Sequence, residues 1–347
     1  MPKISRKTIM IVLLYVGVVA ITPLFSKAPF YRHVLIMVGM YGLLGVAWNI
    51  MGGYTGLYSF GQSAFFGIGA YTSTMMLVKG GFSPWIGMLC GGILAAIVAA
   101  GMAYPTSRLR GPYFTIASQA FARTFQILMT NWDYVEGAIG IPLPLMPDTW
   151  RFMQFKDKIP YHIIIFSLLG IAILVCYYIE RSRTGYYFRA IRDSEQVASA
   201  LGINTVRQRI IATMLSAFFT AIAGTFYSQY VLYIDPESVT HHALSVEIVM
   251  VAAVGGAGTI WGPVLGAAIL MPISQYARAA LGGAGRGIDL IIYGVIIMVI
   301  ALVRPTGILG FFQRERTIEG EGGDDIGTTV TADTGADDAV RGSLGQQ

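Results

Sequence analysis

The chain has 347 residues, of which 54% are hydrophobic and 12% are charged, and its formal net charge is +5. Soluble domains carry about 25% charged residues, so the composition argues against a soluble enzyme or binding module. The basic residues lie between apolar segments rather than in one stripe, which argues against nucleic acid as a partner. The sequence also contains several apolar runs whose length is close to the roughly 20 residues that a membrane-spanning helix needs. These runs predict an all-α, polytopic membrane helical bundle instead.

The first expected element is a helix from Ile9 to Phe25, which follows a basic start. A secretory signal peptide has a similar pattern, but no A-x-A-like cleavage site follows, and Pro23 and Lys27 stand there instead. We therefore interpret this segment as an uncleaved first helix. Nine further candidate membrane segments are 34–51, 57–78, 84–104, 112–130, 161–180, 207–232, 243–254, 260–280 and 287–303.

Two of these candidates are weak, so about eight to ten membrane segments are expected in total. Segment 112–130 contains Gln119, Arg123 and Gln126, and we expect it to pack inside the bundle because polar groups in hydrocarbon are costly. Segment 243–254 is too short to span a membrane alone.

The distribution of basic residues predicts the orientation. With both termini in the cytoplasm, the inner loops hold fourteen Lys and Arg residues and the outer side holds eight, in agreement with the positive-inside rule. The longest outer loop is then 131–160. Residues 1–316 form the predicted transmembrane domain. Residues 317–347 are rich in Gly, Thr and acidic residues, which predicts a disordered tail or, as the alternative, an acidic interaction tail.

Two glycine-rich regions, 51–71 and 254–267, are expected to interrupt helices. Glycine permits left-handed backbone, and broken helices in the two halves of a transporter often mark its solute path. The alternative is that the glycines allow close helix packing, which suits Gly67 and Gly69 better than the doublets Gly52-Gly53 and Gly255-Gly256. The polar residues near the first region are uncharged, which favours an uncharged or zwitterionic solute over an ion.

Glu247 is a second type of candidate, because a carboxylate in an apolar run is often functional. Pairing with a base on a neighbouring helix is the alternative. The residues expected along the solute path are Gly52, Gly53, Tyr54, Ser59, Gln62, Glu247, Gly255, Gly256 and Gly258.

Residues 181–209, here called the platform segment, are predicted to form an amphipathic helix in the cytoplasm. Gly202 stands where such a helix would end in a left-handed cap, and Arg189 and Asp193 are spaced to form an i, i+4 pair. The apolar arc holds Phe188, Ile191, Ala198 and Leu201, and the polar arc holds Arg189, Arg192, Asp193 and Gln196.

The platform segment has two interpretations. It is either a helix that lies on anionic lipid headgroups or a docking helix for a cytoplasmic partner. Acidic residues on its polar face and the small residues at 198–200 favour docking.

Several motifs are missing from the sequence. It contains no G-x-x-x-x-G-K-[ST] phosphate loop, no H-E-x-x-H and no G-x-S-x-G, so no catalytic residues are expected. The pair His241-His242 has no carboxylate or Cys at metal-ligand spacing, and no metal site or bound cofactor is expected. If ATP powers transport, another chain must bind it.

Five motifs carry a resemblance to a known family. In order, they are GGYTGLYSFGQSAFFGIGAY, RLRGPYFTIASQAFARTFQILMTNW, TGYYFRAIRDSEQVASALGIN, VGGAGTIWGPVLGA and RPTGILG. The chain resembles the permease subunits of bacterial branched-chain amino-acid ABC importers, the LivM-like family, from about residue 34 to residue 310.

The resemblance implies a transmembrane permease that moves branched-chain or related amino acids across the inner membrane by alternating access. It implies four partners: a homologous second permease and two cytoplasmic ATPase subunits, which use ATP and Mg, and a periplasmic solute-binding protein. It also implies that the platform segment engages the ATPase, through Arg189, Ile191, Arg192, Asp193, Gln196, Ala198 and Gly202.

Departures from the family pattern leave alternatives open. The chain has Glu136-Gly137-Ala138 where the family usually has Thr-Gly-Gly, which leaves the substrate undecided between amino acids and urea or short-chain amides. A rival from another class is a channel or ion-coupled secondary transporter without an ATPase. A docking helix at the platform segment favours the ATP-driven reading.

Overall fold

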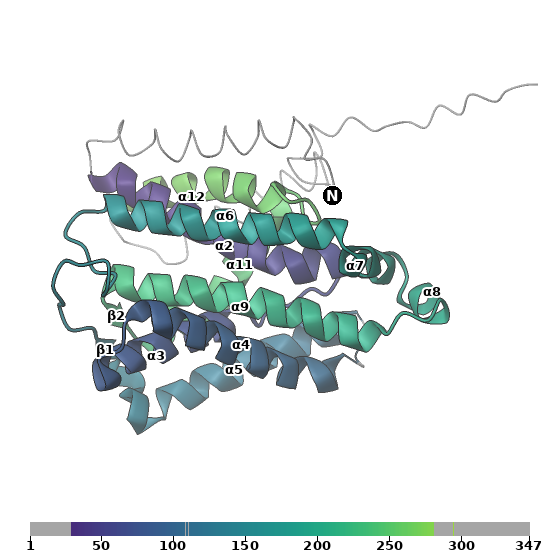
Figure 1. The fold of residues 1–347 in the computed structure, drawn as a ribbon, viewed down its shortest axis with the longest axis horizontal. Helices are drawn as coiled ribbons and strands as arrows, with labels where there is room; N and C mark the ends of the chain where they lie inside the picture. The colour runs from purple at the N-terminus through teal and green to yellow at the C-terminus, as the bar shows by residue number, and fades with distance from the viewer. Residues whose placement is uncertain (1–28, 108, 110, 281–293, 295–347) are drawn as a thin grey trace, which may run out of the picture. The chain divides into compact units, whose positions relative to one another are not determined.

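The computed structural model describes residues 29–107, 109, 111–280 and 294. Over these residues the chain is an assembly of long helices with one two-residue strand pair (Figure 1). The expected helix at 9–25, the expected tail at 317–347 and, apart from residue 294, the expected helix at 287–303 lie outside the described residues.

Each of the eight segments predicted between residues 34 and 280 contains a helix, and the bounds agree within a few residues. The long helices are α2 (Pro29–Thr55), α3 (Gln62–Gly80), α4 (Pro84–Thr106), α5 (Pro112–Thr130), α6 (Ile159–Arg181), α9 (Thr205–Val231), α11 (His242–Gly255) and α12 (Gly262–Ala280). The short helices are α7 (Arg183–Asp193), α8 (Glu195–Ala200) and α10 (Pro236–Thr240), with 3-10 turns η1 (Asp133–Val135) and η2 (Gly137–Ile139).

Five stretches of the described chain are long and apolar enough to cross a membrane. They are α2, α4, α6, α9 and the combined stretch Pro236–Gly255. The short segment 243–254 is therefore joined to α10, which gives it a spanning length. An all-α, multi-pass membrane bundle is the fold, as the sequence predicted.

Helix α2 lies at the centre of the bundle. Every residue from Gly39 to Thr55 is buried, and α2 packs against α6, α9, α11 and α12. A helix that is apolar on all sides, as α2 is, is expected in such a surrounded position.

Helices α3, α4 and α9 pack closely through small residues. A Cβ on Gly69 would collide with the backbone of Ala221, and one on Gly91 would lie 3.2 Å from the Cα of Gly69. A Cβ on Gly67 would collide with Thr240. The packing interpretation of Gly67 and Gly69 is confirmed, because small residues let helix backbones approach in membranes.

Helix α5 lies at the margin of the bundle rather than inside it, as the lowest helix in Figure 1. Its Gln126 is buried, but Gln119 and Arg123 are exposed. The expectation that 112–130 packs inside the bundle is therefore wrong for the face that carries these two residues.

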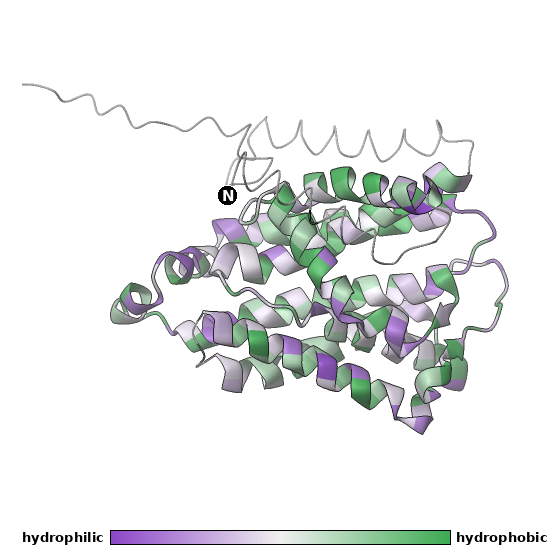
Figure 2. Ribbon diagram, turned by 180° about the vertical axis from the view of Figure 1, so that it is seen from behind, coloured by the Kyte–Doolittle hydropathy of each residue, from purple (hydrophilic) through white to green (hydrophobic). Residues whose placement is uncertain are grey.

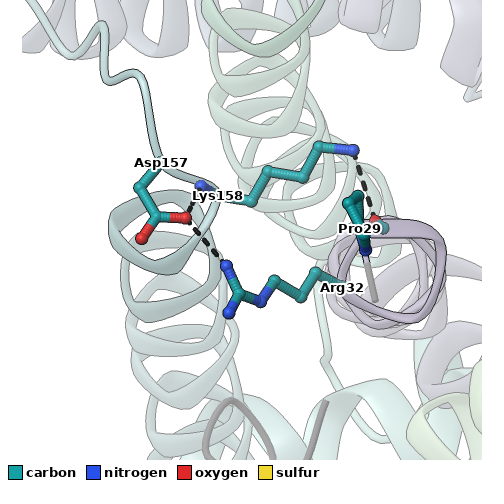
Figure 3. Close-up of polar contacts among 4 residues, drawn as sticks. All are labelled: Pro29, Arg32, Asp157 and Lys158. Atoms are coloured by element: carbon teal, nitrogen blue, oxygen red, sulfur yellow. Dashed lines mark hydrogen bonds and ion pairs between the residues drawn. The ribbon is translucent and has the colours of Figure 1, made fainter. Parts of the chain in front are cut away.

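The two ends of the bundle differ. At one end, β1 (Ile141–Pro142) pairs antiparallel with β2 (Tyr233–Ile234), and Arg32 Nη1 lies 2.9 Å from Asp157 Oδ1, which ties the start of α2 to the loop before α6 (Figure 3). At the other end, α7 and α8 extend past the ends of the long helices (Figure 1). Hydrophilic residues gather at both ends (Figure 2).

Candidate functional site

The first glycine-rich region interrupts the chain between α2 and α3. The doublet Gly52-Gly53 lies within α2, and the helix ends at Thr55. The break begins at Gly56, whose φ of +71° is left-handed, and α3 starts at Gln62. The doublet was predicted to break the helix, but it serves close packing, since a Cβ on Gly53 would lie 2.5 Å from the amide nitrogen of Gly258.

The second glycine-rich region does break at its doublet, as predicted. Helix α11 ends at Gly255, and Gly256 and Gly258 have φ angles of +117° and +85°. A non-glycine residue rarely adopts these angles, so glycine is required by the backbone there. Helix α12 starts at Gly262.

Asn49 joins the two interruptions. Its Nδ2 donates to the carbonyl of Thr259 at 2.9 Å, and its Oδ1 accepts from the amide of Gly258 at 2.7 Å. Asn49 is only 1% exposed, and it lies one helical turn before Gly53 on α2. We call the assembly of Asn49, Gly53, Gly56, Gly256, Gly258 and Thr259 the glycine junction.

Arg192 of the platform segment reaches into the glycine junction. Its Nη1 donates to the carbonyl of Gly53 at 2.9 Å. A Cβ on Gly258 would collide with the same Nη1, and one on Gly56 would lie 3.5 Å from the Arg192 Cγ. One arginine side chain thus contacts both interruptions, and the absence of side chains on the glycines makes room for it.

The platform segment contains two short helices rather than one. Ser194 separates α7 from α8, and its hydroxyl accepts from the amide of Val197 as an N-cap. Phe188, Ile191 and Ala198 are buried, as the apolar arc predicted. Gly202 has a φ of +84°, which confirms the predicted left-handed cap.

Two further expectations for the platform segment are corrected. Leu201 is 75% exposed, because α8 has a different axis from α7 and the single-helix arc does not extend to it. Arg189 does not pair with Asp193. Instead, Arg189 Nη2 donates to the backbone carbonyl of Glu180 at 2.7 Å, and Nη1 lies 3.9 Å from the carboxylate of the same residue. Glu180, at the end of α6, is thus the acidic partner of Arg189 in place of Asp193.

A second tie holds α8 to the bundle. Arg209 Nη2 lies 2.7 Å from Glu195 Oε2, and its Nη1 donates to the carbonyl of Ser107 at 2.8 Å. Arg209 is only 7% exposed, and these two partners offset the cost of burying its charge. Glu195 therefore has a structural role in the platform segment.

The tip of the platform segment is exposed and of mixed character. Val197 is 58% exposed and Leu201 is 75% exposed, one helical turn apart. Asp193 and Gln196 are exposed beside them. An apolar pair with a polar rim has the composition of a protein interface.

The polar residues after the first interruption are enclosed by neighbouring helices. Gln62 is fully buried between α3 and α9, where it donates to Ser216 Oγ at 3.0 Å and accepts from Thr220 Oγ1 at 2.8 Å. Ser59 is buried, and its hydroxyl accepts from the amide of Gly61. The Tyr54 hydroxyl is buried without a hydrogen-bond partner among the described residues.

Glu247 lies inside the bundle in a group that we call the internal cluster. Tyr41 donates its hydroxyl proton to Glu247 Oε2 at 2.5 Å, and Arg278 Nη2 lies 3.6 Å from Oε1. The carboxylate thus holds α2, α11 and α12 together, and pairing with a neighbouring base, the alternative noted from sequence, is observed.

A further group, the exposed cluster, lies on α5 and α10. Arg123 Nη1 donates to Gln126 Oε1 at 2.6 Å, and Gln126 Nε2 donates to Glu237 Oε2 at 2.9 Å. Arg123 and Glu237 are exposed, whereas Gln126 is 6% exposed. Sequence reasoning noted Arg123 but missed Glu237, which falls between the predicted segments 207–232 and 243–254.

The chain matches a family model over residues 30–302, and the family is described as the permease component of branched-chain amino acid transport systems. The match covers most of the described residues, including the glycine junction, the platform segment and both clusters.

Several curated proteins are similar along their length. The high-affinity branched-chain amino acid transport permease LivM of Salmonella typhimurium is 25% identical, over 79% of this chain and 68% of the relative. The permease LivH from the same organism is 26% identical, over 78% of this chain and 91% of the LivH chain. The probable LivM of Methanocaldococcus jannaschii is 24% identical, over 80% of this chain and 92% of its own. No solved structure matches the chain.

Proposed function

Because the chain belongs to the family of permease components of branched-chain amino acid transport systems, we propose that it is the membrane subunit of an ATP-driven importer. Its solute is a branched-chain or related amino acid, and the mechanism is alternating access. Separate ATPase subunits supply the energy, since the sequence has no phosphate loop of its own.

One observation carries the proposal: Arg192 connects the platform segment to the glycine junction through its 2.9 Å hydrogen bond to Gly53. Movement of α7 by a docked ATPase would displace this guanidinium. The displacement would act on both helix interruptions together, because Asn49 binds them to each other. A local displacement of this kind can produce a conformational change of the whole bundle, because packed helices shift between discrete arrangements.

The exposed tip of α8 supports a docking role. Val197 and Leu201 present apolar surface at the end of the bundle that also holds six arginines, at 181, 183, 189, 192, 207 and 209. A concentration of Arg favours the cytoplasmic side of the inner membrane for this end, and therefore the periplasmic side for the β1–β2 end. Cytoplasmic N- and C-termini belong to the same proposal.

The partners follow from the proposed class of transporter. We expect a homologous second permease, two ATPase subunits and a periplasmic solute-binding protein. The resemblance to both LivM and LivH sequences supports a pairing of two related permeases.

The solute path is proposed to pass beside the glycine junction. Gly52, Gly53, Tyr54, Ser59, Gln62, Gly255, Gly256 and Gly258 are its candidate residues. The burial of Gln62 and Ser59 fits a closed state of the alternating-access cycle. Opening then requires Gln62 to exchange its bonds with Ser216 and Thr220 for other partners.

The main test is reconstitution of the full complex in proteoliposomes, with the permeases, ATPases and binding protein of the same organism. We expect uptake of L-leucine that requires ATP. Leucine uptake without ATP would support a channel or secondary transporter, and uptake of urea or acetamide in place of leucine would support an amide permease. Either result would overturn the proposal.

A matched pair of variants tests the docking surface. Leu201→Glu places a charge on the exposed tip, and we expect loss of ATPase copurification and of ATP-dependent uptake. Leu145→Glu is the control, because Leu145 is 85% exposed at the opposite end. Equal ATPase binding by the two variants would contradict docking at α8.

A further inference from the structure

The exposed cluster places opposite charges on a face that nothing in the described chain covers. Arg123 and Glu237 are both exposed, and neither forms an ion pair with another described residue. The buried Gln126 side chain holds them in place through its two hydrogen bonds. The positions of the Arg123 and Glu237 side chains are therefore fixed by hydrogen bonds, unlike those of free surface side chains.

The position of Arg123 along α5 is unfavourable for contact with lipid. Arg123 is eleven residues after Pro112 and seven before Thr130, which corresponds to about 16 Å and about 10 Å from the helix ends. Helix α5 is not one of the five described stretches that are apolar enough to cross a membrane. A charged side chain far from the ends of a helix at membrane depth normally faces protein or a water-filled cavity. Gln119 and Arg123 are both exposed and lie one helical turn apart, so this face of α5 carries polar groups that are costly in contact with lipid. Hydrophilic and hydrophobic positions both recur along α5, the lowest helix in Figure 2.

We propose that Arg123 and Glu237 bind the head group of a zwitterionic amino acid as it crosses the membrane. The guanidinium would bind the solute carboxylate, and the Glu237 carboxylate would bind its ammonium group. The Gln126 amide already presents an acceptor to Arg123 and donors to Glu237. An amino acid zwitterion likewise carries an acceptor, its carboxylate, and a donor, its ammonium group. It could therefore replace the Gln126 amide between Arg123 and Glu237.

The surroundings also suit an apolar side chain. Ile116 and Ile127 are 63% and 53% exposed on α5. They lie seven residues before and four residues after Arg123, so all three side chains share one face of the helix. A branched aliphatic side chain would contact these isoleucines while its head group is bound.

The site is open on one side in this chain, and we assign that side to the second permease. A path between two related subunits would be shielded from lipid, which accounts for polar side chains on an exposed membrane-level face. The six residues of the glycine junction carry no charged side chain, so a solute that passes beside the junction would find its charged partners at the exposed cluster.

This inference rests on the proposed function, and its first test uses the same reconstituted importer. Arg123→Gln and Glu237→Gln should each lower leucine uptake at subsaturating leucine by about tenfold or more, the loss expected for a hydrogen bond to a charged group. Arg123→Lys should retain more uptake than Arg123→Gln. ATPase activity without solute should stay unchanged, which shows that the complex has assembled.

The matched controls are Arg151→Gln and Asp133→Asn, which remove exposed charges from the loop at the β1–β2 end. If the wild-type complex imports leucine and the cluster variants import it as well as these controls do, the site is overturned and the proposed function stands. If the wild-type complex imports no leucine, the proposed function itself fails, and this inference fails with it.

A labelling experiment provides a readout other than transport. Gln119→Cys, four residues before Arg123, is introduced with Cys90→Ser, because Cys90 is exposed whereas Cys176 is buried. In the assembled complex we expect a charged, membrane-impermeant thiol reagent to modify this cysteine, and L-leucine to slow the reaction. Leucinamide, which lacks the carboxylate, and isocaproate, which lacks the ammonium group, should protect less.

The control for labelling is Ile93→Cys on α4, where Ile93 is 55% exposed among other apolar side chains. It should stay unmodified because its face contacts lipid. An unreactive Gln119→Cys would overturn the water-filled path at α5. Equal protection by leucine and its two analogues would overturn recognition of the zwitterion.

Discussion

The internal cluster and the exposed cluster use the same residue types in opposite ways. In the internal cluster the carboxylate of Glu247 is buried, and it contacts both Tyr41 and Arg278 directly. In the exposed cluster, an amide stands between Arg123 and Glu237, and both charged groups are exposed.

The difference separates structural from functional charges. Charges that meet inside a bundle neutralise each other and have no capacity left for a solute. Charges that are held apart by a neutral side chain keep their capacity to bind. We therefore expect substitutions in the internal cluster to reduce stability first, and those in the exposed cluster to reduce transport without loss of stability.

The largest effect on stability is expected for Glu247→Ala. It removes the ion pair with Arg278 and the hydrogen bond from the Tyr41 hydroxyl. We expect a loss of about 2–3 kcal/mol, less than the about 3–5 kcal/mol of a fully buried pair because Arg278 is half-exposed. Thermal unfolding of the purified protein in detergent measures this loss.

The control for this comparison is Asp157→Ala, which removes the exposed pair with Arg32 and the exposed hydrogen bond from the Lys158 amide, both shown in Figure 3. An exposed ion pair contributes at most about 1 kcal/mol, so the melting temperature of the Asp157→Ala variant should differ little from that of the wild type. Normal stability of Glu247→Ala together with abolished uptake would move Glu247 from the structural group to the functional one.

A smaller effect is expected for Tyr41→Phe. The variant keeps the aromatic ring and removes the hydroxyl that donates the 2.5 Å hydrogen bond to Glu247. A hydrogen bond to a charged group contributes about 1.5–3 kcal/mol, and the remaining contact with Arg278 places the loss near the lower bound. Comparing the melting temperature of the variant with that of Tyr104→Phe, whose ring is 62% exposed on α4, isolates this bond.

Most of the fold was predictable from the sequence, because it depends on apolar runs and helix ends. Segment 112–130 agrees with α5 at both ends, and Gly202 was identified as a left-handed cap. The position of the first break was wrong by three residues, because Gly52 packs against the Trp48 side chain and Gly53 packs against Gly258 within a continuous helix. A pattern of glycines does not distinguish these two roles.

The candidate site was less predictable, because its contacts join residues that are far apart in the chain. Arg192 and Gly53 are separated by 139 positions, and Asn49 and Gly258 by 209. The two glycine-rich regions were the local signal of the glycine junction, whereas the role of Asn49 in joining them had to come from the structure. Glu237 had no such signal, since Gln126, its partner, is 111 positions away.

The smallest effect on stability, and the sharpest contrast with Glu247, is expected for Glu237→Gln. The glutamine keeps the length of the side chain and retains an acceptor for Gln126 Nε2, and the position is exposed. The melting temperature should therefore correspond to a change within about 0.5 kcal/mol, as for other surface substitutions. Leucine uptake should fall in the same preparation, because the ammonium group of the solute loses its counter-charge. A large loss of stability in this variant would mean that both carboxylates are structural, and the contrast between the two clusters would then disappear.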